Sequence, residues 1–407
     1  MKRFYERYKL AVDLAVVSLV LMLFVFVGAH VTLTTSRVVE KEIAPALTKT
    51  AEKAASALEE LSSATAAEDI PSFTLAWSEY PSWSTFGVAH EVGIINGEKG
   101  KLGPIEKKWG VDIVLVEADY DPCITGYASG QFDASCLTNM DVLNPALGRK
   151  SVAIAPTSTS YGADACIVTN DITDIKQLKG KNVYMLAKSV SEYAFCGGIE
   201  ALGGNTNDYT IVNMDPAAAA LAMQQRQDGY NAIMVWNPFV LETLNKRKDV
   251  HDAFNSTKIP AEIIDMVIMG QDSVNKPKGR EFACAVIETF YAVSKLIANP
   301  ETHGDTVVAL GEKFSHLGLK DMEKALEQTI FFATPEQGIS LYTDGIICPT
   351  GKTITTKTLK PIMEKVVDFC IVKEIIPDKP KISYGTKEDG SNLRFDPSFM
   401  QEVLRKQ

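Results

Sequence analysis

Aromatic and acidic side chains follow the apolar run FTLAW, where Trp77, Glu79, Tyr80 and Trp83 lie close together in the sequence. Two indoles, a phenol and a carboxylate at the end of one predicted strand suit a flat or cationic nitrogen compound, which stacks on the rings and hydrogen-bonds to the acid. The alternative is that Trp77 packs in the core and Glu79 is a solvated loop residue. We expect these four side chains to form one wall of a ligand site.

Short polar side chains end a second predicted strand and begin a helix further along the chain. Asn139 and Asp141 close the run FDASCLT, whereas Ser189, Ser191 and Glu192 follow the run YMLAK. Free N–H groups at a helix start bind an anion or a carbonyl oxygen, and serine hydroxyls assist them. Helix capping is the alternative for both groups, with Asp141 serving the segment DVLNPAL. We carry all five residues forward as candidate ligand contacts.

Two more candidates come from the segment MDPAAAALAMQQRQDGYNAIMVWNPFV at residues 214–240. Asp215 precedes Pro216, an arrangement typical of a helix N-cap with proline at the first helical position, which needs no ligand. Trp236 ends the apolar run NAIMVW and stands before Asn237 and Pro238. We include Asp215 and Trp236 among the ligand-binding candidates, with plain capping as the alternative at Asp215.

These candidates must be positioned by short β-rich runs that alternate with helical stretches, a pattern that predicts an α/β fold with a mainly parallel sheet covered by helices. The pattern predicts lobe 1 at residues 71–162 and lobe 2 at residues 163–262. The run IIDMVIM then returns the chain to lobe 1, which helices up to residue 385 complete, and residues 386–407 form a loosely held polar tail. Strands are expected at 73–77, 111–118, 132–138, 151–157, 165–169, 182–186, 209–214, 231–236 and 263–269.

A membrane anchor is predicted at residues 10–29, an apolar run long enough to cross a hydrocarbon core as a helix. The run follows four basic residues, Lys2, Arg3, Arg7 and Lys9. By the positive-inside rule, residues 1–32 form a single-pass anchor in the cytoplasmic membrane, with the bulk of the chain on the periplasmic, extracytoplasmic side. A cleaved signal peptide is the alternative. Residues 33–70 are rich in Ala, Glu and Lys and predict a stalk.

Composition narrows the classes of partner and chemistry. The 407-residue chain carries a formal net charge of −10, with no clustered Lys and Arg after its first residues, which disfavours nucleic acid. Its seven cysteines form no CxxC pair or Cys/His cluster, so neither a metal nor a cofactor is expected. Most should be buried free thiols, although one disulfide, such as Cys123 with Cys136, stays open. We expect no enzyme, because no GxSxG, HExxH, P-loop or GxGxxG motif is present.

Three segments in order resemble one family of proteins. They are LAWSEYPSWSTFGVAHEVGII at 75–95, YASGQFDASCLTNMD at 127–141, and the segment at 214–240. Together with ITDIKQLKGKNVYML they resemble the substrate-binding proteins of ABC importers in the nitrate, sulfonate and taurine group, with the related thiamine-precursor binders. The resemblance covers residues 73–377. It implies a two-lobed periplasmic-binding-protein fold of type II, which closes on a small solute and delivers it to a membrane permease.

Charge narrows the expected solute. The candidates include the acids Glu79, Asp141, Glu192 and Asp215, and Lys188 is the one base near them. Carboxylates in a desolvated cleft oppose an anion, so we expect a small neutral or cationic nitrogen compound that is urea-, amide- or guanidinium-like. An oxyanion such as nitrate or a sulfonate is the alternative. A biosynthetic enzyme of the same fold and a sensor input domain are the remaining alternatives.

Overall fold

The computed structural model describes residues 70–314, 316–343 and 359–406. The predicted anchor and the stalk up to residue 69 lie outside these ranges. Within them, no helix combines the length and the apolar character needed to cross a membrane.

Lobe 1 is built on an eight-stranded sheet. Seven of its strands follow the order β12-β13-β4-β10-β3-β1-β2, and the eighth, β11, pairs with β4. Strand β1 pairs in parallel with β2 and β3, whereas β10 is antiparallel to both β3 and β4. The strands are β1 (Ser72–Trp77), β2 (Asp112–Glu117), β3 (Ala134–Thr138), β4 (Ser151–Ser160), β10 (Ile264–Gly270), β11 (Thr329–Phe331), β12 (Ile382–Tyr384) and β13 (Leu393–Phe395).

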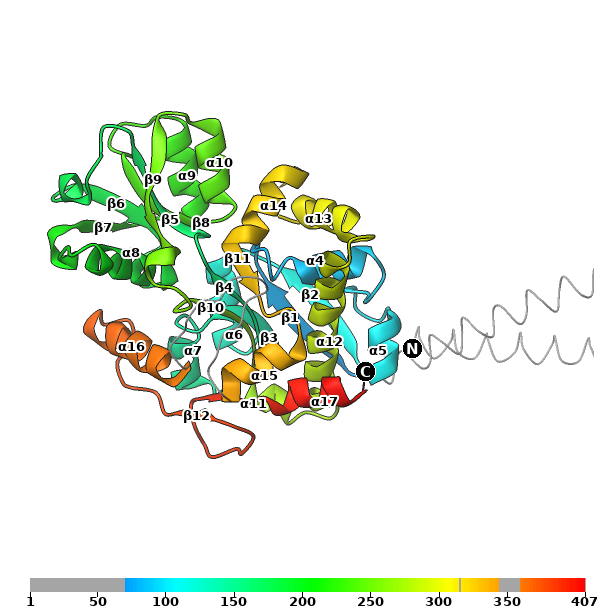
Figure 1. The fold of residues 1–407 in the computed structure, drawn as a ribbon. Helices are drawn as coiled ribbons and strands as arrows, with labels where there is room; N and C mark the ends of the chain where they lie inside the picture. The colour runs from blue at the N-terminus through cyan, green and yellow to red at the C-terminus, as the bar shows by residue number, and fades with distance from the viewer. Residues whose placement is uncertain (1–69, 315, 344–358, 407) are drawn as a thin grey trace, which may run out of the picture. The chain divides into compact units, whose positions relative to one another are not determined.

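Lobe 2 is built on a five-stranded sheet with the order β7-β6-β8-β5-β9. Strand β6 is parallel to β7 and β8, and β5 is antiparallel to β8 and β9. Both sheets therefore repeat one arrangement, in which an antiparallel strand arriving from the other lobe lies beside the parallel ones (Figure 1). The strands are β5 (Asp164–Thr169), β6 (Asn182–Met185), β7 (Thr210–Asn213), β8 (Ala232–Trp236) and β9 (Val250–Asn255).

The mixed sheets correct the prediction of a mainly parallel sheet. The chain passes between lobes twice, from β4 into β5 and from β9 into β10. Each arriving strand is antiparallel to the strands on both sides of it, since β10 lies between β4 and β3 and β5 lies between β8 and β9. The strand positions themselves agree with the expected runs to within about two residues at most ends, but β4 extends to Ser160. Strands β9, β11, β12 and β13 were not expected, since they are polar or only three residues long.

Helices cover both sheets, and their boundaries follow local capping chemistry where it is present. Helix α12 (Gly279–Ala298) is the longest helix of the described residues. Its Phe282 stacks on Phe73 of β1 with ring centroids 4.7 Å apart. Lobe 2 carries α8 (Val190–Ala201), α9 (Pro216–Gln224) and α10 (Phe239–Lys246). The other helices are α4 (Thr85–Glu91), α5 (Pro104–Trp109), α6 (Tyr120–Ala128), α7 (Leu143–Gly148), α11 (Gln271–Val274), α12 (Gly279–Ala298), α13 (His303–Glu312), α14 (Leu319–Gln328), α15 (Pro335–Thr343), α16 (Leu359–Val372) and α17 (Ser398–Lys406).

The C-terminal segment corrects a second prediction, because residues 386–406 are not a loosely held polar tail. Strand β13 pairs in parallel with β4, and its Phe395 is fully buried. Helix α17 follows and buries Phe399 and Met400. The few apolar residues of this polar segment form no periodic pattern from which a strand or helix could be predicted. Phe395, Phe399 and Met400 are nevertheless buried in the lobe 1 core.

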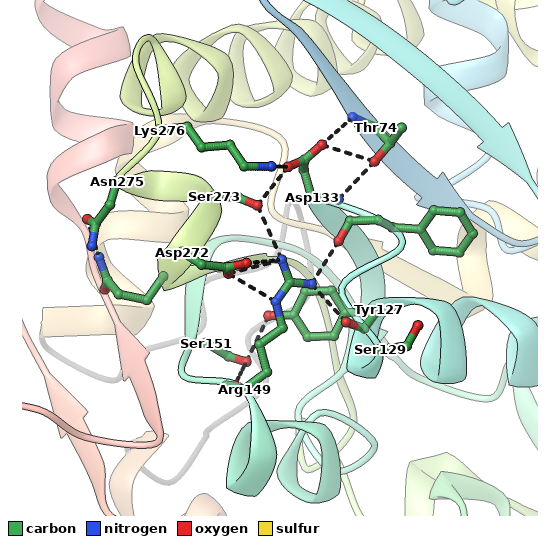
Figure 2. A network of polar contacts seen from close by, with 12 residues as sticks. Thr74, Tyr127, Ser129, Asp133, Arg149, Ser151, Asp272, Ser273, Asn275 and Lys276 are labelled. Atoms are coloured by element: carbon green, nitrogen blue, oxygen red, sulfur yellow. Dashed lines mark hydrogen bonds and ion pairs between the residues drawn. The ribbon is translucent and has the colours of Figure 1, made fainter.

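A polar network holds the end of the lobe 1 sheet where β3 begins and β10 ends (Figure 2). Arg149 donates to the backbone oxygens of Tyr127 and Phe132, each at 2.8 Å, and forms a bidentate pair with Asp272. Gly270 passes so close to this pair that a Cβ there would overlap the Arg149 guanidinium and the Asp272 carboxylate. The guanidinium thus supplies hydrogen-bond donors to backbone oxygens that lie beyond the ends of the strands.

Asp133 completes the network beside β1. Its carboxylate accepts the backbone N–H of Thr74 at 2.9 Å, the Ser273 hydroxyl at 2.7 Å and the Lys276 ammonium at 2.6 Å. All these residues lie at the end of the sheet opposite to the C-terminal ends of β1, β2 and β3. We therefore assign the network to the stability of lobe 1.

The cysteines of the described segments are free and buried, which leaves Cys123 and Cys136 unlinked. The open alternative of a disulfide between these two residues is not observed.

Candidate functional site

A cleft of about 910 Å³ lies at the C-terminal ends of strands from both sheets. Open α/β sheets bind ligands at this edge, because the loops that leave parallel strands converge there. Lobe 1 supplies the loops after β1 and β2, and lobe 2 supplies those after β6, β7 and β8. The lining residues are Ser78, Glu79, Glu117, Ala118, Asp119, Tyr120, Asp121, Pro122, Leu186, Ala187, Asn213, Asp215, Pro216, Ala217, Trp236 and Phe239.

The lining of this cleft is acidic. Its carboxylates are Glu79, Glu117, Asp119, Asp121 and Asp215, and among the described residues no Lys or Arg lines it. Partial burial, followed by the negative charge of Glu79, raises the pKa of Glu117. Several carboxylates around one cleft create a negative potential, which attracts cations and opposes anions.

A smaller pocket adjoins the cleft and is walled by rings from both lobes. We call Tyr80, Trp83, Tyr120 and Trp236 the aromatic box. Ring centroids are 5.1 Å apart for Tyr80 and Trp83, 5.5 Å for Trp83 and Tyr120, and 5.9 Å for Tyr120 and Trp236. Tyr120 and Trp236 line the cleft as well as the box. The remaining lining is Thr138, Asp164, Val190, Ile263 and Asp265, around a space of about 20 Å³.

Two buried carboxylates face this pocket from the strands that pass between the lobes. Asp164 begins β5 in lobe 2, and Asp265 lies in β10 of lobe 1. Burial raises the pKa of Asp164 to about 6. Burial is also the main reason why the pKa of Asp265 lies well above its usual range, even though its carboxylate accepts the Ser158 hydroxyl at 2.5 Å. Both acids therefore resist ionisation while no cation is near them.

Asp141 has a different role from the predicted ligand contact, because its carboxylate joins the lobes. It accepts the hydroxyls of Tyr120 at 2.8 Å and Thr138 at 2.9 Å in lobe 1. From lobe 2 it accepts the backbone N–H of Val190 at 3.1 Å, in the first turn of α8. It thus caps a helix of the opposite lobe rather than the segment that follows it in sequence. Burial still raises its pKa to about 6.

Other candidates are also engaged by the protein. The Asn139 amide donates to the backbone oxygen of Glu262 and accepts the backbone N–H of Ile264, both at 3.0 Å, so it fixes the chain where it re-enters lobe 1. The Ser189 hydroxyl accepts the backbone N–H of Ser191 at 3.2 Å as the N-cap of α8.

Glu192 turns toward the protein as well. It accepts the backbone N–H of Lys188 at 2.8 Å and pairs at 3.3 Å with Lys373, the residue that follows α16. The Ser191 hydroxyl is buried and has no hydrogen-bond partner in the described segments. Neither of the two pockets is lined by Asn139, Asp141, Ser189, Ser191 or Glu192.

The aromatic candidates divide between the box and the core. Tyr80, Trp83 and Trp236 wall the box. Trp77 lies instead over Gly87, beside a separate space of about 220 Å³, and belongs to the packing of α4 on β1. Asp215 lines the cleft and also caps α9 by accepting the backbone N–H of Ala218 at 2.9 Å, so both of its predicted roles are compatible.

Sequence reasoning missed the loop after β2 and both pocket acids. The segment ADYDP directly follows the predicted strand VDIVLVEA, and the strand-end rule that selected Glu79 and Trp236 applies equally to Asp119 and Tyr120. Asp265 carried a signal of its own, since a lone acid within the apolar run IIDMVIM is costly unless it has a role.

Removing the Asp141 carboxylate should loosen the junction between the lobes. We expect Asp141→Ala to cost about 2–4 kcal/mol in the free energy of unfolding, because two hydroxyls and one N–H lose their acceptor. Urea unfolding measures this loss, and small-angle X-ray scattering should show a larger radius of gyration. Asp119→Ala, an exposed carboxylate nearby, is the control. An Asp141→Ala protein with parental stability and radius would contradict this role.

Asp164 should make the folded protein less stable at higher pH. Its pKa is about 6 in the folded chain against 3.8 for an unperturbed aspartate, so its ionisation opposes folding above pH 6 and has no effect below pH 4. At pH 8 we expect the free energy of unfolding of Asp164→Asn to be about 2–3 kcal/mol higher than that of the parent protein. The gain should shrink to nothing at pH 4. Urea titrations at both pH values check this, and an equal change at both would rule it out.

Comparison with known proteins places the fold. No protein-family model matches the chain. No curated protein matches its sequence. Solved structures match it in fold at low sequence identity.

Three of these structures are binding proteins. The periplasmic aliphatic sulphonate-binding protein SsuA of Escherichia coli has a TM-score of 0.57 and 15% identity, over 76% of this chain and 94% of that one. A putative periplasmic sulfonate-binding protein of Methylobacillus flagellatus gives 0.58 and 15%, over 83% and 95%. The periplasmic nitrate-binding protein NrtA of Synechocystis gives 0.53 and 13%, over 83% and 89%. The structural neighbours are thus in the group that the sequence resembles, and the chain has the two-lobed fold of the periplasmic solute-binding proteins.

Proposed function

We propose that this chain is the extracytoplasmic solute-binding component of an ABC importer. It captures a small solute between its lobes and delivers it to a membrane permease. The observation that carries this proposal is the cleft of about 910 Å³, to which both lobes contribute strand-end loops. A ligand that contacts both walls favours the closed arrangement of two lobes joined by two chain passages, which is how a permease distinguishes loaded from empty protein.

The location of the protein rests on its N-terminal residues. The apolar run at 10–29 and the basic residues before it favour a single-pass anchor with the lobes outside. The stalk then keeps the binding lobes near the permease at high effective concentration. The periplasmic location in the names of the structural neighbours supports the same side of the membrane.

An enzymatic role is not our proposal. The structural neighbours named above are described as binding proteins, and the chain lacks the catalytic motifs sought in its sequence. The chemistry proposed for the cleft is recognition and release.

Two solute classes have specific support. The names of the structural neighbours, which bind sulfonate or nitrate, favour the oxyanion alternative. The residues of this chain favour a neutral or cationic nitrogen compound, because the cleft is lined by carboxylates and, within the described residues, by no basic side chain. Fold similarity at this sequence identity does not identify the ligand, since proteins with the same fold differ in their binding residues.

A fusion of alkaline phosphatase to the C-terminus of the full chain tests the location. We expect phosphatase activity in intact cells, since the enzyme folds only outside the cytoplasm, and loss of this activity when residues 1–32 are deleted. A fluorescent protein that matures only in the cytoplasm, fused at the same position, is the reciprocal control. Fluorescence without phosphatase activity would place the lobes on the wrong side for this function.

A thermal-shift panel on the full chain tests solute binding. It includes urea, acetamide, guanidinium and alkylammonium salts, nitrate, taurine and an alkanesulfonate, and native mass spectrometry looks for a co-purified solute. A solute at 100 times its Kd should stabilise the folded state by about 2.7 kcal/mol. Stabilisation by one class identifies the solute class. If no compound shifts the melting temperature and no solute co-purifies, the proposal fails.

A further inference from the structure

We propose that the aromatic box is a site for an alkylammonium cation, with the Asp164 and Asp265 carboxylates as its counter-charges. This inference rests on the proposed solute-binding function and specifies its ligand. It concerns the inner pocket, whereas the acidic cleft outside it serves as the approach.

The rings of the aromatic box come from segments that are far apart in sequence. Tyr80 and Trp83 belong to the loop after β1, Tyr120 begins α6, and Trp236 ends β8 in the other lobe. Neighbouring rings along this series lie 5.1 to 5.9 Å apart at varied angles, so they form a curved wall rather than a flat stack. Ring faces attract a cation through their quadrupoles, and several rings around one space are the arrangement that holds methylated ammonium groups.

The charge inside the box is unbalanced. Asp164 and Asp265 both line the pocket, and none of its lining residues is a Lys or Arg. The cost of ionising these acids is set first by burial, and at Asp265 the negative charge of Asp164 adds to it. A cation placed between the two carboxylates supplies the missing opposite charge, whereas an anion in the same place adds to the repulsion.

One indole adds a requirement for an oxygen atom on the ligand. Trp83 is buried with 3% of its surface exposed, and its Nε1 donor has no hydrogen-bond partner in the part of the chain that the structure describes. A buried N–H group without an acceptor is costly, so a ligand that presents an oxygen to it gains affinity. Choline combines a trimethylammonium group with a hydroxyl and is the probe that we choose.

The cleft and the box are arranged in sequence along one path. Tyr120 from lobe 1 and Trp236 from lobe 2 line both spaces, and their rings lie edge-on to each other. The carboxylates of the cleft attract cations toward this contact. Since the box encloses about 20 Å³, room for a water molecule or two, a cation enters only when the lobes separate and then close around it.

Isothermal titration of the full chain with choline and with 3,3-dimethyl-1-butanol tests the charge requirement. The two probes have the same shape, but the alcohol has a carbon atom where choline has its quaternary nitrogen. We expect choline to bind at least about 10-fold more tightly than the alcohol, since only the cation interacts with ring quadrupoles and carboxylates. Equal affinities would overturn the proposal, because the box would then be recognising shape and apolar surface alone.

Variants locate the site. Asp164→Asn and Trp236→Leu should each weaken choline binding by about 10-fold or more, and Trp236→Phe should restore most of the affinity because it keeps a ring face. The matched control for the charge change is Asp368→Asn, an exposed carboxylate on α16. Circular dichroism establishes that each variant is folded. Parental choline affinity in folded Asp164→Asn and Trp236→Leu would place the site elsewhere and overturn the proposal.

Titrations of the full chain with choline, tetramethylammonium, nitrate and an alkanesulfonate separate this inference from the function on which it rests. If nitrate or an alkanesulfonate binds and choline and tetramethylammonium do not, the cation site is wrong while solute binding stands. If the cations bind and the anions do not, both stand. If neither class binds and no solute co-purifies with the chain, both fall.

Discussion

Three buried carboxylates lie where the two sheets meet, and the cost of removing their charge from water constrains everything around them. Asp141 meets this cost with three donors, one of which belongs to the other lobe. Asp164 and Asp265 lie on the strands that pass between the lobes, and burial opposes the ionisation of both. A charged group in such a place is destabilising unless it has a partner, so the junction costs stability as long as these two acids lack one.

The same junction links the two lobes through contacts of several kinds. Tyr120 donates its hydroxyl to Asp141 while its ring lies edge-on to Trp236 of lobe 2. Helix α16 and the residue after it reach lobe 2 in another place. Phe369 of α16 lies edge-on to Tyr193 of α8, and Lys373, just beyond α16, pairs with Glu192. The hydrogen bonds of Asp141 and the contact between Tyr120 and Trp236 therefore hold the same two lobes together.

The comparison with sulfonate- and nitrate-binding structures separates two kinds of information in the chain. The overall fold is a property of the scaffold, and it is shared at 13 to 15% identity. The shared fold by itself does not determine which side chains stand at the strand ends. In this chain the lining is rich in carboxylates and rings, which matters more for the choice of solute than the shared fold does.

The sequence by itself determined the local features. Apolar runs with sharp ends predicted most strands, and the strand-end position of Tyr80, Trp83 and Trp236 marked them as candidates. Asp215 and Ser189 were recognisable as caps, since capping depends on neighbours within a few residues. The three-residue strands β11, β12 and β13 were not recognisable, because long-range pairing and not local preference forms them.

Only the tertiary structure decided which candidates meet. In the structure Trp77 packs in the core, and the Asn139 side chain hydrogen-bonds to the backbone. Asp164 and Asp265, from strands of different lobes, line the same pocket. Asp141 caps a helix that begins at Val190 instead of the segment beside it. The physical reason is that hydrogen bonds and charges act over a few ångströms in space, whereas a sequence reports only the neighbours along the chain. Which side chain satisfies which buried group is settled when distant strands are placed side by side.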